Sequence, residues 1–220
     1  HIASKGKPVI ISTGMSYLEE IKKALDWIDA AREGSSGRPA VTLLHCVSDY
    51  PAEPEDINLL AMESLASNFD LPVGYSDHTR GIEVSIAAAA LGATVIEKHF
   101  TLDRSMEGPD HNASAEPEEL RAMVAAIRNV EKALGDGVKR PAKCEDRMRN
   151  IARRSLVAAC DIKAGEAIRR EDIRIKRPGM GLPPERIEDL INKKASRDIE
   201  KDTLFTLEHI NITDNKEAAR

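Results

Sequence analysis

The chain has 220 residues, of which 41% are hydrophobic and 31% are charged, a balance typical of a soluble globular protein with one or two domains. Acidic and basic residues are intermixed and the net charge is −5, so the basic surface of a nucleic-acid-binding protein is missing and we expect no nucleic-acid partner. No apolar run approaches the roughly 18 residues of a membrane span, so no membrane partner is expected either.

The cysteines and the start of the chain bear on its location and completeness. Cys46, Cys144 and Cys160 are widely spaced and form no CxxC pair, which argues against a disulfide framework and a structural zinc site. We therefore expect a reducing, cytoplasmic location. The first residues do not form a secretory signal, and the chain begins without methionine, so we expect a fragment of a longer protein.

Four strand-and-helix units follow one another in the first part of the chain. Each strand is short, apolar and rich in β-branched residues, and each helix places apolar residues at i, i+3, i+4 and i+7. Ser16 and Ser114 are the predicted N-terminal caps of the first and last helices. The predicted strands are 8–12, 41–47, 72–76 and 94–100, and the predicted helices are 17–32, 56–68, 81–91 and 117–134.

This alternation predicts an α/β fold with parallel strands joined by right-handed crossovers. A closed (β/α)8 TIM barrel needs eight such units and roughly 250 residues, whereas this chain supplies four units before its character changes. We therefore predict half of a (β/α)8 barrel over residues 1–137. The alternative is a short open sheet, which would leave apolar strand edges uncovered.

A second, smaller domain is predicted in the last third of the chain. A Gly-Asp-Gly sequence ends the last helix of the half-barrel, and turn-forming and charged residues after it indicate an exposed linker. Residues 161–173 are echoed by residues 198–210, and this weak repeat predicts a compact pseudo-symmetric β module. We predict a linker over 138–150, a β-rich domain over 151–212 with strands at 155–159 and 173–176 and a helix near 184–191, and a polar tail over 213–220.

Two histidines are the most informative residues of the first domain. His78 and His99 each follow an apolar run that is typical of a buried strand. Because the carboxyl ends of parallel strands meet at one mouth of the sheet, we expect the two imidazoles to lie together. Imidazoles supplemented by oxygen ligands suit Mn, Zn, Fe or Co better than Ca or Mg, so the pattern favours a metal site. The alternative is that each ring is a core histidine bonded to a neighbour.

Hydroxyl groups at the same strand ends indicate a phosphate site, because backbone amides and helix N-termini there favour an anion. Ser12, Ser48 and Ser76 are the candidates. His45, which precedes a strand end, is interpreted as a structural histidine, and Trp27 as a core residue on its helix.

A loop and a turn carry two further candidates. The loop 101–111 is too polar and too rich in glycine and proline to be core, and it lies where a barrel places a loop over its substrate. Asp110 in this loop either binds sugar hydroxyls or caps the helix that follows. In the second domain, Arg177 lies in a cationic turn and either reaches an anion or carbonyl outside its own module or is an ordinary solvated arginine.

Five segments resemble the sialic acid synthase family, in order along nearly the whole chain. The resemblance identifies the first domain as the C-terminal half of that family's barrel, and the second as its small SAF (antifreeze-like, β-clip) domain. The segments are KPVIISTGM at 7–15, LLHCVSDYP at 43–51, GYSDHT at 74–79, EKHFTLDRSMEGPDH at 97–111 and KRPGMG at 176–181.

The resemblance implies an N-acetylneuraminate synthase, a transferase that condenses phosphoenolpyruvate with N-acetylmannosamine and water to give N-acetylneuraminate and phosphate. It implies a divalent metal ion, Mn²⁺ in first place with Mg²⁺ or Co²⁺ as alternatives, and a domain-swapped homodimer. The implied roles are metal binding and catalysis for His78 and His99, catalysis and sugar contact for Glu97, phosphoenolpyruvate binding for Ser12, Ser48 and Ser76, and sugar binding for Tyr50, Asp110 and, across the dimer, Arg177.

Some positions depart from the family pattern. Ser48 stands where some members have asparagine, and Ile151 where some carry an aromatic residue over the sugar, so the sugar is less constrained than the reaction. The nearest alternative is a legionaminic or pseudaminic acid synthase acting on a 2,4-diacetamido-2,4,6-trideoxy sugar. The family's first barrel half is absent from these residues, so we expect the 220 residues alone to be inactive. The alternative of another class is a non-catalytic carbohydrate- or ice-binding fragment.

Overall fold

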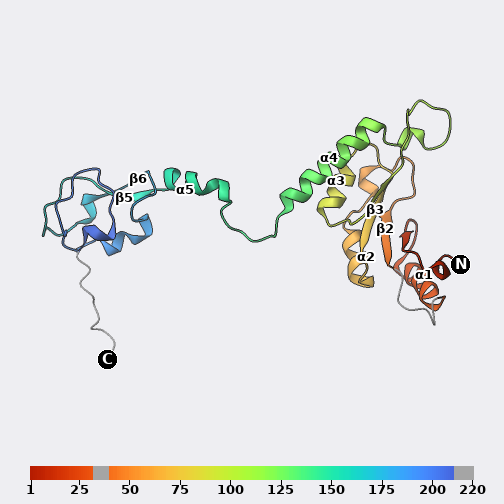
Figure 1. Ribbon diagram of the computed structural model, residues 1–220, viewed down its shortest axis with the longest axis horizontal. Helices are drawn as coiled ribbons and strands as arrows, with labels where there is room; N and C mark the ends of the chain where they lie inside the picture. Colours follow the sequence, from red (N-terminus) through yellow and green to blue (C-terminus); the bar gives the residue numbers. More distant parts are fainter. Residues whose placement is uncertain (32–39, 211–220) are drawn as a thin grey trace. The chain divides into compact units, whose positions relative to one another are not determined.

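The computed structural model describes residues 1–31 and 40–210, which form two units, His1–Val138 and Lys139–Arg220 (Figure 1). The predicted polar tail over 213–220 lies outside the described residues, as does the last residue of the first predicted helix, residue 32. Within the described ranges, no helix is both long enough and apolar enough to cross a membrane. Each unit has its own hydrophobic core.

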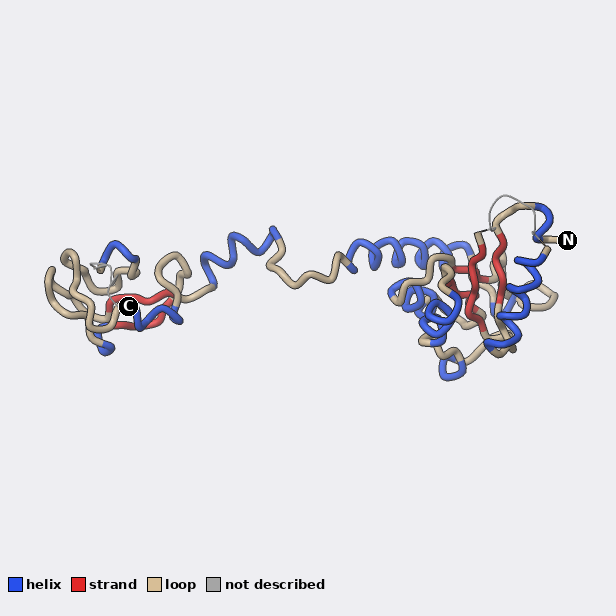
Figure 2. Tube along the Cα trace, turned by 90° about the horizontal axis from the view of Figure 1, so that it is seen from below, coloured by secondary structure: helices blue, strands red, loops and turns tan. Residues whose placement is uncertain are grey.

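The first unit is built on a parallel sheet of four strands in the order β1-β2-β3-β4. Leu43, Leu44 and Tyr75 on the two central strands are completely buried, as the apolar character of those runs predicts. Figure 2 shows the strands side by side with helices flanking them. The strands are β1 (Val9–Ser12), β2 (Val41–Cys46), β3 (Val73–Asp77) and β4 (Ile96–Lys98).

The four predicted strands are confirmed, with bounds that differ from the prediction by one or two residues. β4 ends at Lys98, two residues before the predicted end. The reason is that Phe100 forms a bridge with Ala115, in the segment that leads into the following helix, and so leaves the ladder with β3. The first two predicted strands each differ from the observed ones by a single residue at one end.

Four helices follow the strands in alternation, as predicted. They are α1 (Leu18–Ala30), α2 (Ala61–Phe69), α3 (Glu83–Ala90) and α4 (Pro117–Leu134). The prediction for the second helix, 56–68, was wrong at its start. A short 3-10 turn, η2 (Pro54–Asp56), comes first, and the left-handed backbone of Asn58, with φ of 51°, separates it from the α-helix.

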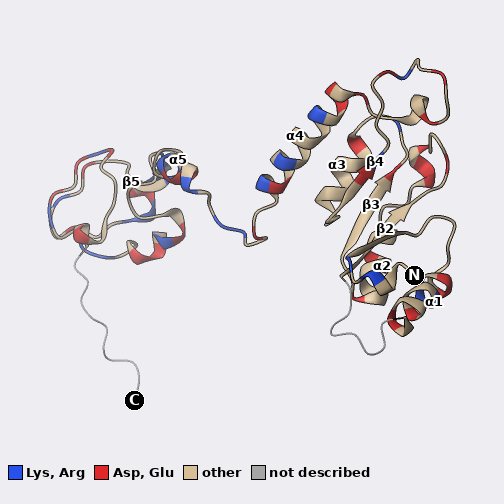
Figure 3. Cartoon of the chain, turned by 45° about the vertical axis from the view of Figure 1, so that its right-hand side comes forward, with Lys and Arg blue, Asp and Glu red and all other residues tan. Residues whose placement is uncertain are grey.

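The predicted helix caps were also wrong. The N-cap residues are Tyr17 for α1 and Glu116 for α4, and the backbone N–H of each donates to a glutamate three residues later. This replaces the hydroxyl cap, because a carboxylate in the first turn accepts the free amide and faces the positive helix end. The Ser114 hydroxyl instead donates to the backbone oxygen of Asp110. Figure 3 shows acidic residues at the start of α4 and basic residues further along it.

Trp27 is not a core residue, contrary to the prediction. Its side chain is 65% exposed, whereas Ile21 and Leu25 of the same helix are buried. The two buried residues are four positions apart and share a face, but Trp27 lies two positions beyond Leu25, a rotation of about 200° at 3.6 residues per turn. It therefore lies off the face that packs in the core, beside the exposed side of β1, where it lines a hollow with Ile10 and Ser12. The ammonium group of Lys23 lies 5.3 Å from its ring centroid.

The order and direction of the strands identify the first unit as half of a barrel. Four parallel strands, each followed by a helix, are half of the eight units of a (β/α)8 barrel. Within the described residues, β1 and β4 each pair with one strand only, so both outer edges of the sheet lack a second strand. The predicted fold class is confirmed for this unit.

The second unit is a small β-rich module around an antiparallel pair, β5 (Ser155–Ala158) and β6 (Ile173–Lys176). Leu156, Ile168, Leu190 and Phe205 are completely buried and form the centre of its core. The helix predicted near 184–191 is a 3-10 helix, η6 (Pro184–Asp189), interrupted by non-helical backbone at its third residue.

The weak sequence repeat has a structural counterpart. Ile162 and Ile199, at the second position of each copy, exchange two backbone hydrogen bonds of 2.8 Å. The Asp161 carboxylate accepts the backbone N–H of Lys201, and the Asp198 carboxylate accepts that of Ala164, so each aspartate binds the other copy at the same offset. Both copies end in a 3-10 turn, η5 (Arg170–Asp172) and η7 (Leu207–His209). The module is pseudo-symmetric, as predicted.

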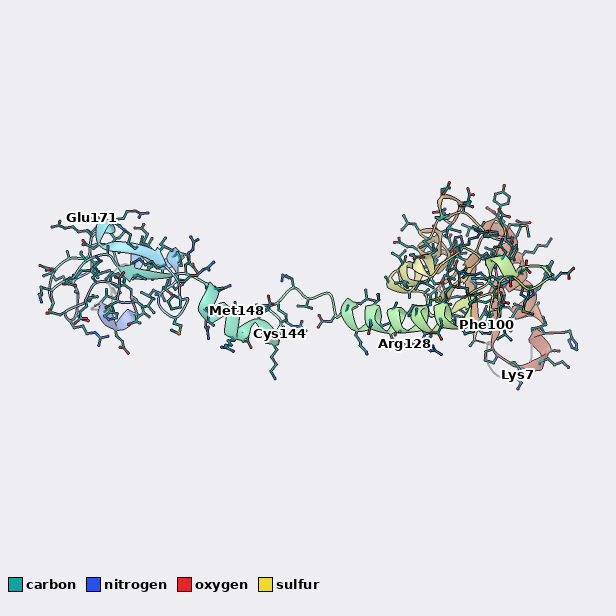
Figure 4. All side chains as sticks on the ribbon, turned by 90° about the horizontal axis from the view of Figure 1, so that it is seen from above. Lys7, Phe100, Arg128, Cys144, Met148 and Glu171 are labelled. Carbon is teal, nitrogen blue, oxygen red and sulfur yellow. The ribbon has the colours of Figure 1, made fainter. Side chains whose placement is uncertain are left out.

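The segment predicted as a linker is exposed throughout but is not irregular. It contains a 3-10 turn, η4 (Lys143–Glu145), which runs into helix α5 (Asp146–Ala152). The Glu145 carboxylate accepts the backbone N–H of Ala142 and so caps this start. Cys144 and Met148 project outward from this segment (Figure 4).

Candidate active site at the carboxyl ends of the strands

His78 and His99 lie side by side at the carboxyl ends of β3 and β4. Asp77 and Lys98, the last residues of the two strands, are partners in the parallel ladder, so the next residue of each strand is brought to the same level. The centroids of the two imidazole rings are 5.3 Å apart and the ring planes are nearly perpendicular, at 81°. The Tyr50 ring packs against both, at 4.2 Å from His78 and 5.3 Å from His99.

The hydrogen bonds of His78 define which of its nitrogens is available. Nδ1 lies 2.6 Å from the backbone oxygen of Val47, and because a carbonyl oxygen can only accept, Nδ1 carries the proton. In the neutral ring Nε2 then has a free lone pair, and it lies 3.3 Å from the Ser76 hydroxyl. A backbone carbonyl that fixes the tautomer in this way is the usual partner of a metal-binding histidine.

Ser76 and Glu97 complete the floor of the site. They are ladder partners on β3 and β4, and the Ser76 hydroxyl donates to Glu97 Oε1 at 3.1 Å. Side chains two residues apart on a strand share a face, so Ser76 and Glu97 point to the same side of the sheet as the two histidines. Burial, followed by the nearby Cys46, Asp110 and Glu97, raises the pKa of Tyr50, which keeps the phenol neutral next to this cluster.

Asp110 approaches the site from the loop after β4. Its Oδ2 lies 3.9 Å from His99 Nδ1. The alternative role of Asp110 as a side-chain helix cap is wrong, because its side chain makes no capping hydrogen bond to the 3-10 turn η3 (His111–Ala113) and α4 is capped by Glu116. The loop is closed at its base by a 2.7 Å hydrogen bond between Thr101 Oγ1 and His111 Nδ1.

Ser48 and Ser12 lie on the neighbouring strands. Ser48 follows β2, and its hydroxyl packs so tightly against Gly14, in the loop after β1, that a Cβ on Gly14 would lie 2.3 Å from it. Cys46 lies in the same contact, and burial raises the pKa of its thiol. Ser12 ends β1 and is separated from the end of β3 by β2. Arg177, by contrast, belongs to the second unit, where it follows β6 and is exposed.

The donor set of the site fits a divalent metal with an open coordination sphere. No group of three or more His, Cys, Asp and Glu side chains that could hold a metal is present in the described ranges. The two imidazoles meet the requirement for nitrogen ligands, and the fixed tautomer of His78 leaves Nε2 free for one bond. Water and substrate oxygens would then fill the other positions, as in catalytic rather than structural sites.

The comparisons with known proteins agree with this geometry. Residues 1–139 match the NeuB family, and residues 153–211 match the SAF domain. The chain belongs to the NeuB family. The resemblance to sialic acid synthases drawn from the sequence is thereby confirmed, and so is the fold class of a half-barrel followed by a SAF domain.

Relatives of this NeuB-family chain carry several synthase names. It is 49% identical over 204 residues to N,N'-diacetyllegionaminic acid synthase of Campylobacter jejuni, covering 93% of this chain and 60% of that protein. It is 38% identical over 202 residues to human N-acetylneuraminate-9-phosphate synthase, covering 91% and 55%. The chain therefore spans a little over half the length of these relatives.

A solved structure supports the same assignment. The crystal structure of N-acetylneuraminic acid (sialic acid) synthetase from Leptospira borgpetersenii serovar Hardjo-bovis is 39% identical to this chain. The two align with a TM-score of 0.59 over 67% of this chain and 50% of that one.

Sequence reasoning missed a group of buried polar residues behind the histidines of this NeuB-family chain. Asp77 and Lys98 form an ion pair of 2.9 Å, with side chains that are 0% and 2% exposed, and Thr79 and Ser85 bind the same carboxylate. The signal was present in the sequence, since residues of opposite charge immediately precede the two histidines. The structural role of His45 is confirmed, because its Nε2 lies 2.6 Å from the backbone oxygen of Ile57.

Proposed function

We propose that this chain is the C-terminal part of a phosphoenolpyruvate-dependent nonulosonic acid synthase. In the proposed reaction, C3 of phosphoenolpyruvate bonds to the aldehyde carbon of an open-chain N-acetylated amino sugar, water adds at C2, and phosphate leaves by C–O cleavage. The observation that supports it best is the convergence of His78, His99, Ser76 and Glu97 at one mouth of a NeuB-family half-barrel.

The residues around the two histidines are assigned to the sugar. His78 and His99 would hold the divalent ion, Mn²⁺ in first place with Mg²⁺ or Co²⁺ as alternatives. When bound, that ion supplies a Lewis acid for the aldehyde oxygen. Glu97, oriented by the Ser76 hydroxyl, and Asp110 accept hydrogen bonds from sugar hydroxyls. Tyr50, whose ring packs against both imidazoles, would contact the sugar.

Phosphoenolpyruvate is assigned to the serine hydroxyls of the first three strands. Ser12 ends β1, Ser48 follows β2 and Ser76 is the last residue but one of β3, so together they lie at the strand ends on one side of the histidines. The Ser12 and Ser48 hydroxyls would donate to the negative charge that the departing phosphate develops, and the Ser76 hydroxyl would do so on turning away from Glu97.

The identity of the sugar is the finer part of the proposal. N-acetylmannosamine, which would make the enzyme an N-acetylneuraminate synthase, is the substrate expected from the sequence. The 49% and 46% identities to two N,N'-diacetyllegionaminic acid synthases exceed the 38% to the human N-acetylneuraminate-9-phosphate synthase and favour a 2,4-diacetamido-2,4,6-trideoxy sugar as a second candidate. A pseudaminic acid synthase matches at 42%. Because several of these relatives are named as synthases, they favour an enzyme over a carbohydrate- or ice-binding fragment.

A homodimer in the cytoplasm completes the proposal, with Arg177 of one copy reaching the N-acetyl group bound by the other. Charge supports this arrangement. Residues 1–138 contain 22 acidic and 12 basic residues, whereas residues 139–220 contain 15 acidic and 20 basic residues. The half-barrel is thus net acidic and the SAF unit net basic, which favours contact between unlike units.

The test is an activity assay on a chimera in which these residues replace the matching part of the Campylobacter jejuni synthase. We expect phosphate release from phosphoenolpyruvate that requires a divalent metal and one of the two sugars, and loss of that release in His78→Ala and His99→Ala. The 220 residues alone are expected to be inactive, because the other half of the barrel is missing from them. A folded chimera that is inactive with every sugar and metal would contradict the proposal.

A further inference from the structure

A fully buried ion pair lies directly behind the two histidines. Asp77 and Lys98 immediately precede His78 and His99 in the sequence and are partners in the ladder between β3 and β4. Their side chains are almost completely shielded from solvent, and Lys98 Nζ lies 2.9 Å from Asp77 Oδ2. Because neighbouring residues on a strand point to opposite faces, this pair occupies the face of the sheet opposite to the site.

Every strong acceptor position of the Asp77 carboxylate is used. Oδ1 accepts the backbone N–H of Thr79 at 2.9 Å and its hydroxyl at 2.7 Å. Oδ2 accepts the Ser85 hydroxyl of α3 at 2.5 Å and the Lys98 ammonium. A buried carboxylate satisfied in this way is held in one orientation, since any rotation would leave a buried donor unpaired.

Lys98 also forms a hydrogen bond with the backbone next to His78. Its ammonium donates to Asp77 Oδ2 and, at 2.7 Å, to the backbone oxygen of Thr79, so it contacts the residues on both sides of that histidine. The regular strands end at Asp77 and Lys98, one residue short of each imidazole. The side chain of the residue before His99 therefore links the two strand ends where the β3–β4 ladder has ended. On its other side the His78 segment is held by the backbone N–H of Ala52, which donates to the His78 oxygen at 3.0 Å.

Stability alone does not account for this arrangement. Removing two charges from water costs about as much as their attraction returns, and well-packed apolar residues of similar volume are often as stable or more stable. What the ion pair adds is a defined link between two strand ends, made of directional contacts.

We propose that Asp77 and Lys98 are positioning residues that set the separation of the His78 and His99 imidazoles. The proposal deepens the proposed function, on which it rests, because the separation concerned is the one that a divalent cation would need. It assigns no contact with substrate to either residue.

The first test measures the distance between the rings without metal. The double variant Asp77→Asn/Lys98→Met removes both charges together, keeps the shapes of the two side chains and leaves an oxygen acceptor for Thr79, so it is expected to fold. With histidine-labelled, metal-free protein, we expect the nuclear Overhauser contact between the His78 and His99 rings to be lost while the far-ultraviolet circular dichroism spectrum of the folded chain is kept. The melting temperature should fall, because the buried Thr79 oxygen loses its donor. A retained ring contact would overturn the proposal.

Control variants separate positioning from folding. Lys22→Met/Asp26→Asn removes an exposed ion pair of α1 by the same chemistry and should leave the ring contact intact. The single variant Lys98→Arg, which keeps the positive charge and several N–H donors, should retain the contact between the His78 and His99 rings. If the double variant does not fold, the neutral pair Asp77→Asn/Lys98→Gln, which keeps an amide donor on the side of the Thr79 backbone oxygen and leaves no buried charge unpaired, provides the measurement. A weakened ring contact is expected, and an unchanged one would contradict the proposal.

The second test uses Mn²⁺ itself, followed by the electron paramagnetic resonance signal of the free ion. The double variant should bind Mn²⁺ about 10–100-fold more weakly than the unsubstituted chain, the scale seen when residues that orient metal ligands are removed. Equal affinity would overturn the proposal. If the unsubstituted chain binds no Mn²⁺, the proposed metal site is wrong. The positioning role of Asp77 and Lys98 is then tested by the ring contact alone.

Discussion

Replacing Gly14 with alanine tests how tightly the loops after β1 and β2 are packed at the site. The added Cβ would lie 2.3 Å from the Ser48 hydroxyl oxygen and 2.9 Å from Cys46 Sγ. Ordinary contacts are about 3.5 Å, so the hydroxyl has to retreat by about 1 Å. Cys46 is buried and cannot move freely, so we expect Gly14→Ala to lower the free energy of unfolding by about 1–3 kcal/mol, the usual cost of overpacking.

A double-mutant cycle distinguishes this clash from a general effect of substitution. Ser48→Ala removes the oxygen that the new methyl group meets, so Gly14→Ala/Ser48→Ala should be more stable than Gly14→Ala alone, with a coupling of about 0.5–3 kcal/mol. Urea denaturation followed by circular dichroism measures all four proteins. Additive effects, or a Gly14→Ala variant as stable as the unsubstituted chain, would show that the two loops do not meet as described.

Two further predictions concern the contribution of single residues to the free energy of unfolding. Burial and the Arg197 guanidinium lower the pKa of His209 below its ordinary value of 6.5. Below pH 6.5 the unfolded chain therefore binds more protons than the folded chain. The stability that the neutral His209 contributes above pH 6.5 should be lost as the pH falls toward the folded pKa. Urea denaturation at pH 7.5 and pH 5 should show this loss for the unsubstituted chain but not for His209→Gln. Phe205→Ala should lower the free energy of unfolding by about 3–5 kcal/mol, because the Phe205 side chain is completely buried. Trp27→Ala should lower it by less than about 1 kcal/mol, because Trp27 is exposed. Similar denaturation midpoints for the two variants would contradict this assignment of the core.

The strand-and-helix alternation was predictable because it depends on local patterns. Parallel strands buried on both faces are continuous apolar runs, and Leu43, Leu44 and Tyr75 show this in the structure. The proximity of His78 and His99 follows from the same pattern, since residues that end adjacent parallel strands meet at one edge. The repeat in the second unit was detectable because two buried positions, Ile168 and Phe205, recur at the same offset in both copies.

Features that depend on tertiary contacts were not predictable. Ser16 and Ser114 have the right chemistry for helix caps, but the glutamates in the first turns satisfy the amides of Tyr17 and Glu116 instead. The exposure of Trp27 depends on which face of α1 meets the sheet. Asp77 and Lys98 are 21 residues apart in the sequence, and their opposite charges before the two histidines were a signal. That they form an ion pair also requires the register of β3 and β4, which the sequence pattern alone does not specify.

The proposed function depends on the imidazoles of His78 and His99 binding one divalent cation. Titration of the chain with Mn²⁺, followed by the electron paramagnetic resonance signal of the free ion, measures this directly. We expect one bound Mn²⁺ per chain, lost in both His78→Ala and His99→Ala and retained in the exposed control His1→Ala. Binding that survives both substitutions, or no binding by the unsubstituted chain, would contradict it.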